Sequence, residues 1–72
     1  MARIDKKFKS RVTVHYKKNG ETRYLKTFTD RFESLDQVKS HVLAHGCKGY
    51  GTLDVAVYQP DTEYFKTFRM RS

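Results

Sequence analysis

Two histidines and a cysteine stand close together in the second half of the chain, and their side chains are of types that hold metals. His41 and His45 are four residues apart, a spacing that places two imidazoles on one side of a helix, and Cys47 follows two residues later. A structural zinc site needs four such ligands, and no second cysteine or neighbouring carboxylate completes the set. The sequence therefore favours packed histidines and a buried cysteine over a metal centre or a nucleophile.

Catalytic patterns are not found in the rest of the chain. Gly46, Gly49 and Gly51 precede an expected strand, whereas a phosphate-binding glycine loop leads into a helix. A chain of 72 residues supports one small core and a modest stability, which leaves little to hold a strained catalytic site. We therefore expect a non-enzymatic binding protein with no cofactor.

The charge of the chain is unevenly distributed. The chain has 15 lysines and arginines and 8 aspartates and glutamates, a net charge of +7. Residues 1–31 hold ten of the basic and three of the acidic side chains, so this part carries the whole excess. Such asymmetry predicts an anionic partner: nucleic acid, an acidic protein surface or anionic lipid. Among these we expect nucleic acid or a host nucleoprotein complex, and no membrane.

A β-hairpin is predicted near the N-terminus. Apolar and polar residues alternate over 11–17, Asn19-Gly20 is typical of a type I′ turn, and 22–29 form the return strand. A regular two-residue loop would place Lys18 opposite Glu21, His15 opposite Tyr24 and Val14 opposite Leu25. One face would then show Val12, Val14 and Leu25 as core, and the other would show Arg11, Thr13, His15, Lys17, Tyr24, Lys26 and Phe28.

A helix and a second hairpin follow. Ser34 and Gln37 form a capping box, and apolar residues at helical spacing predict a helix over 35–45 that ends at Gly46. Strands are predicted over 52–58 and 63–70, joined by a turn at Pro60-Asp61. We therefore expect a single α+β domain, residues 1–72, of order ββαββ: a four-stranded antiparallel sheet with one helix packed on one face. Residues 1–9 would be a basic arm or a short leading strand.

The sheet face without a helix is the predicted functional surface. Aromatic side chains left in water mark an interaction surface, and rings among cations suit unpaired bases and their phosphates. An alternative is that this face is covered by a second copy in a homodimer or by residues 1–9. The candidate partner-binding residues are Arg11, His15, Lys17, Lys18, Arg23, Tyr24, Lys26, Phe28, Tyr58, Phe65 and Arg69.

Two resemblances to known families bear on this surface. Lys48-Gly49-Tyr50-Gly51-Thr52-Leu53-Asp54-Val55 resembles the RNP1 signature of RNA-recognition and cold-shock domains, without the aromatic residues at its fifth and eighth positions. The segment from Ser34-Leu35 through Gly51-Thr52-Leu53 into the last hairpin, with the size, element order and charge of the chain, resembles small phage-encoded anti-CRISPR proteins. That second resemblance implies a non-enzymatic protein that binds a host nucleoprotein machine. The alternative function is therefore a protein-directed inhibitor of a host complex, with no direct nucleic-acid binding.

The sequence also predicts a location. One cysteine permits no intrachain disulfide, which is usual in a reducing compartment. No apolar run approaches the length of a transmembrane helix or a signal peptide. We expect a cytoplasmic protein, in the host cytoplasm if it is phage-encoded.

Overall fold

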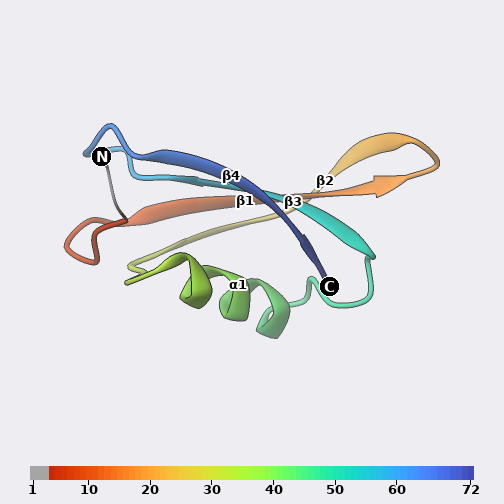
Figure 1. The fold of residues 1–72 in the computed structure, drawn as a ribbon, viewed down its shortest axis with the longest axis horizontal. Coiled ribbons are helices and arrows are strands. Elements are labelled where there is room, and N and C mark those ends of the chain that lie inside the picture. Colours follow the sequence, from red (N-terminus) through yellow and green to blue (C-terminus); the bar gives the residue numbers. More distant parts are fainter. Residues whose placement is uncertain (1–3) are drawn as a thin grey trace.

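The computed structural model describes residues 4–72 as one antiparallel sheet with one helix. In chain order the elements are β1 (Ser10–Lys18), β2 (Glu21–Asp30), α1 (Leu35–Ala44), β3 (Thr52–Tyr58) and β4 (Phe65–Arg71). The strands lie in the order β2-β1-β3-β4. Figure 1 shows α1 on one side of the sheet and no element on the other. The predicted α+β class and the order ββαββ are confirmed.

The β1–β2 turn forms as the sequence predicts. Asn19 and Gly20 have φ values of 52° and 79°, the two positive values that a type I′ turn requires. Lys18 lies opposite Glu21, and His15 lies opposite Tyr24. The hairpin extends away from the rest of the molecule, beyond the end of α1 (Figure 1).

A β-bulge in β2 changes the face on which the rest of this strand projects. The register shifts between Val14 and His15, so Val14 lies opposite Lys26, and Leu25 is the extra residue. An extra residue inverts the alternation beyond it. The prediction that Lys26 and Phe28 share the outer face with Tyr24 is therefore wrong, as is the pairing of Val14 with Leu25. Phe28 instead lies opposite Val12 on the helix side.

The core lies between the sheet and α1. It is built mainly from valines of β1, β3 and α1, with Leu53, Phe32, Cys47 and Tyr64. At the start of α1 the backbone N–H of Gln37 donates to Ser34 Oγ at 3.3 Å, which satisfies a free helical donor. The helix ends one residue earlier than predicted, with His45 as its C-cap and Gly46 at φ 92°. No helix within residues 4–72 has the length and apolar character that crossing a membrane requires.

The N-terminal segment forms a turn at the edge of the core. The backbone N–H of Phe8 donates to Asp5 O at 3.1 Å. Gln59 is fully buried, and its Nε2 lies 2.8 Å from Asp5 O and 3.0 Å from Ser10 Oγ. Residues 4–9 therefore form a turn that is held by hydrogen bonds to Gln59, and they do not form a leading strand. Residues 1–3 of the predicted arm lie outside the described residues.

Candidate functional site

The sheet surface opposite α1, which we name the open face, is the candidate site. The pairing registers give three rows across the strands, each with one residue per strand. In the order β2, β1, β3, β4 the rows are Thr29, Arg11, Tyr58, Phe65, then Thr27, Thr13, Ala56, Thr67, and then Tyr24, His15, Asp54, Arg69. Lys17, Thr22, Thr52 and Arg71 continue the face beyond the third row.

The first row, which we name the aromatic row, presents two rings beside a cation. Tyr58 is 41% exposed and Phe65 is 63% exposed, and they lie opposite each other on β3 and β4. Arg11 is the neighbour of Tyr58 on β1. Within residues 4–72 neither ring packs against another aromatic ring, so no such contact competes with a base for their exposed parts.

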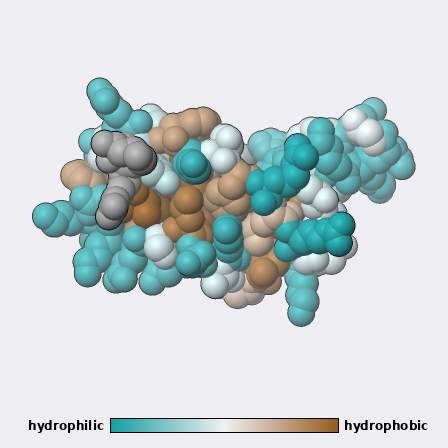
Figure 2. Space-filling model, in the orientation of Figure 1, coloured by the Kyte–Doolittle hydropathy of each residue, from teal (hydrophilic) through white to brown (hydrophobic). Residues whose placement is uncertain are grey.

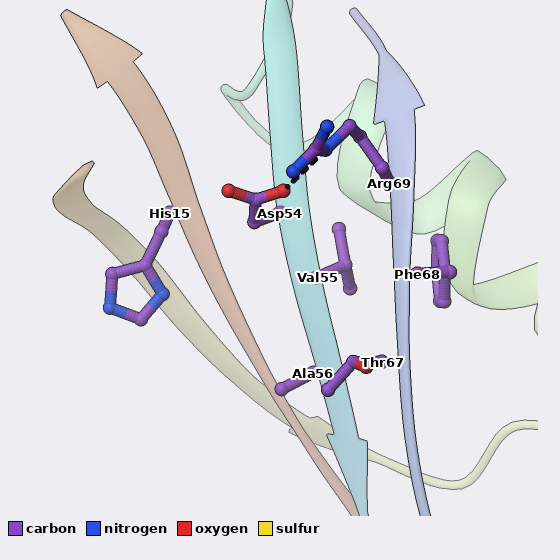
Figure 3. A pocket seen from close by; sticks show the side chains of 7 residues that line it. All are labelled: His15, Asp54, Val55, Ala56, Thr67, Phe68 and Arg69. Atoms are coloured by element: carbon purple, nitrogen blue, oxygen red, sulfur yellow. Dashed lines mark hydrogen bonds and ion pairs between the residues drawn. The ribbon is translucent and has the colours of Figure 1, made fainter. Parts of the chain in front are cut away.

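The third row, which we name the charged row, presents a positioned tyrosine and an ion pair. The Tyr24 ring meets His15 edge-on, with centroids 5.7 Å apart, and its hydroxyl lies 2.8 Å from Thr27 Oγ1. Arg69 Nε donates to Asp54 Oδ1 at 3.0 Å. Figure 3 shows His15 on β1 and Asp54 on β3 beside a shallow depression, with Arg69 reaching across from β4.

Small side chains separate these two rows. The middle row contains only threonine and alanine. Arg11 and His15 are four residues apart on β1, which corresponds to about 13 Å along an extended strand. The open face thus presents aromatic rings in its first and third rows, with small side chains in the row between them. An extended polymer can lie across all three rows.

The open face is electropositive. It carries Arg11, Lys17, Arg69 and Arg71, whereas Asp54 is the acidic side chain that the registers place on it within the described chain. Asp54 is paired with Arg69, so the other three cations are available to an anionic ligand. Exposed surface pairs add little stability, and the arrangement is therefore better suited to binding than to holding the fold.

Lys26 and Phe28 hold the helix instead of lining the open face. Lys26 Nζ donates to the carbonyl oxygen of His45 at 3.0 Å, and a cation is favourable at a helix C-terminus. The Phe28 ring meets His41 edge-on at 4.8 Å. His41 and His45 stack at 4.1 Å. Burial, and then the nearby His45, lower the pKa of His41, while Asp30 acts in the opposite direction.

Lys18 and Arg23 also lie away from the open face. Arg23 lies opposite Tyr16, on the side of the core, and its guanidinium is 3.1 Å from the Glu21 carboxylate. Lys18 lies next to the turn, opposite Glu21. Both are exposed near the hairpin tip, so they can add to the positive field of the molecule but do not adjoin the two ring-bearing rows.

The described residues contain no cluster suited to a metal. No group of three or more histidine, cysteine, aspartate or glutamate side chains lies within residues 4–72 in a metal-binding arrangement. Cys47 is buried, and burial raises the pKa of its thiol. A thiol held in its neutral form is a weak nucleophile.

The RNP1-like segment contributes no ring to the open face. Its Tyr50 packs against Tyr16 at 5.0 Å, and its outward positions on β3 are Thr52 and Asp54. Arg71, in contrast, belongs to the open face and was not predicted. Its signal in the sequence is the alternation that continues from Arg69, which a strand ending at residue 70 omits.

The chain was compared with protein-family models, curated proteins and solved structures, and no match was found. The class that the fold and the open face define is an α+β protein with a basic and aromatic sheet surface that residues 4–72 leave uncovered.

Proposed function

We propose that this protein is a small, basic, non-enzymatic binding protein that takes single-stranded nucleic acid on its open face. The observation that carries the proposal is the aromatic row: Tyr58 and Phe65 lie side by side, exposed, next to Arg11. Aromatic side chains stack on bases of any sequence, and neighbouring cations bind the backbone phosphates.

Single strands are favoured over duplexes by the chemistry of this surface. A ring stacks only on a base whose face is accessible, and the bases of a duplex stack on each other. The two rows of rings are separated by a floor of threonine and alanine. A flexible strand can adapt to that spacing, whereas a rigid duplex would rest on the cations alone.

The salt dependence of binding tests the electrostatic part of the proposal. Arg11, Lys17 and Arg71 have no acidic partner within residues 4–72. Three phosphate contacts predict a log–log slope of about −2 for a single strand, at ~0.7 per contact. We expect this slope from the fluorescence anisotropy of a labelled oligothymidylate at several salt concentrations.

A matched pair of variants shows whether the contacts belong to the open face. Arg11→Gln should make the slope shallower by about 0.7. Arg31→Gln, which removes the same charge from an exposed position outside the open face, should leave the slope close to that of the unmodified protein. The proposal is refuted if no oligonucleotide, DNA or RNA, binds at low salt.

A second candidate function is that of a phage-encoded inhibitor, acting in the host cytoplasm, that docks on a nucleic-acid-handling complex. Phe65 favours it, because a fully apolar ring that is 63% exposed suits the apolar pocket of a protein partner. Capture from nuclease-treated host lysate separates the two functions. Nucleic-acid binding predicts that nuclease removes the captured material, and inhibition predicts one stoichiometric protein that remains.

A further inference from the structure

The outer edge of β4 is a second surface with binding chemistry. In the part of the chain that the structure describes, β4 pairs only with β3, in a continuous register from Thr52 opposite Arg71 to Tyr58 opposite Phe65. An edge strand directs the N–H and C=O groups of alternate residues outward, where another strand can pair with them. β4 contains neither a proline nor a bulge that would prevent such pairing.

The opposite edge of the sheet, formed by β2, is protected against pairing with a further strand, whereas the β4 edge is not. β2 carries the bulge at Leu25, and bulges are a known means of making an edge unsuitable for pairing. Lys26, next to the bulge, is bonded to the end of α1. The two edges therefore differ, and only β4 offers a regular seven-residue template.

The side chains that border the β4 edge combine an apolar strip with cations. Phe68 and Met70 are partly buried on the helix side, and Lys39 Nζ lies 5.4 Å from the centroid of the Phe68 ring. Every charged residue of β4 is basic, namely Lys66, Arg69 and Arg71. Figure 2 shows hydrophobic surface between β4 and α1 with hydrophilic residues around it.

The positive charge of β4 determines which kind of strand can pair with its outer edge. A second copy of the chain paired through β4 would bring two identical sets of cations together, and lysines on an edge strand are a known obstacle to self-pairing. Glu33 and Asp36 line a depression beside Tyr64 and Lys66. Glu33 is paired with Lys6, and Asp54 is paired with Arg69. An acidic segment is therefore the complementary partner.

We propose that the β4 edge binds an extended acidic peptide, which adds to the sheet as a fifth strand. Backbone hydrogen bonds to β4 would supply the affinity, as in other cases of strand addition. Successive side chains of an added strand alternate between the two faces of the sheet. The carboxylates of the peptide would lie on the helix side, where they meet Lys39 and Lys66, and its apolar side chains would lie on the open-face side beside Phe65. The cations of this site differ from those of the proposed function, because Lys39 and Lys66 lie outside the open face.

The probe is an acetylated and amidated heptapeptide of alternating glutamate and valine, titrated to about 1 mM into the ¹⁵N-labelled protein. We expect amide shifts concentrated in β4. The double variant Lys39→Glu/Lys66→Glu should weaken binding at least about fivefold, because two surface attractions become repulsions. The control Lys18→Glu/Arg31→Glu changes the net charge equally on the β2 side, and it should retain most of the affinity.

Two further measurements test whether binding depends on the charge of the peptide and whether the peptide site is distinct from the nucleic-acid site. A heptapeptide of alternating lysine and valine should not shift the β4 amides. The Lys39→Glu/Lys66→Glu variant should still bind oligothymidylate, so failure of the peptide site and failure of the nucleic-acid site are distinguishable. The proposal is overturned by equal binding of the two peptides, by the absence of β4 shifts, or by sedimentation that shows a dimer at the concentration of the titration.

Discussion

Replacing Tyr58 by alanine tests whether the aromatic row stacks on bases. A base stacked on an aromatic side chain contributes about 1–3 kcal/mol to binding. Because Tyr58 is 41% exposed, part of its ring is already covered by the sheet, and the lower part of that range applies. We expect Tyr58→Ala to lose about 1–2 kcal/mol, a 5- to 30-fold weaker affinity at ~1.4 kcal/mol per tenfold, measured by anisotropy with oligothymidylate at one fixed salt concentration.

Tyr50 provides the control for this substitution. It is also a tyrosine of 41% exposure, but it lies in the loop before β3 with its ring against Tyr16. Tyr50→Ala should cost a comparable part of the stability and leave the affinity unchanged. Equal losses of affinity in the two variants, or none in Tyr58→Ala, would show that the aromatic row does not stack on bases.

Three further predictions concern the elements that position the open face. Lys26→Met removes the hydrogen bond to the His45 carbonyl and should lower the free energy of unfolding by about 0.5–1 kcal/mol, without a change in oligonucleotide affinity; thermal denaturation and anisotropy check both parts. The lowered pKa of His41 means that folding favours its neutral form, so stability should be full above the ordinary histidine pKa of 6.5 and decline as the pH falls below it. Urea denaturation between acid and neutral pH should show this decline, and His41→Gln should reduce it. Deletion of Leu25 should leave all other β1–β2 pairs in place, since Leu25 is the extra residue, and the contact between Phe28 and His41 should persist in nuclear Overhauser spectra; loss of that contact would contradict the assigned bulge.

Local patterns in the sequence were sufficient for the elements that short-range chemistry determines. Asn19-Gly20 specifies its turn through two positive φ values, and Ser34 specifies the start of α1 through a side-chain bond three residues away. Alternation in β1 and β3 separates Val12 and Val55 in the core from the outward residues. These predictions succeed because their causes lie within a few residues of one another.

The features that the sequence did not predict depend on distant contacts. The bulge at Leu25 has no local signature, because the run from Thr22 to Thr29 alternates acceptably in either register. What selects the observed one is the helix: Phe28 packs against His41 and Lys26 bonds to His45. The hydrogen bond between Gln59 and Asp5 joins residues 54 positions apart. The polar groups that Gln59 contacts cannot be identified before the strand order is known.

The two proposed sites are coupled through β4. Arg71 projects onto the open face from β4, the strand at whose edge an acidic peptide would bind. Carboxylates bound there would neutralise part of the field that attracts phosphates, so an acidic peptide should weaken oligonucleotide binding. Linkage requires the oligonucleotide to weaken peptide binding by the same factor. Two titrations in opposite order therefore measure one quantity, and a factor of one would show that the two sites are not coupled.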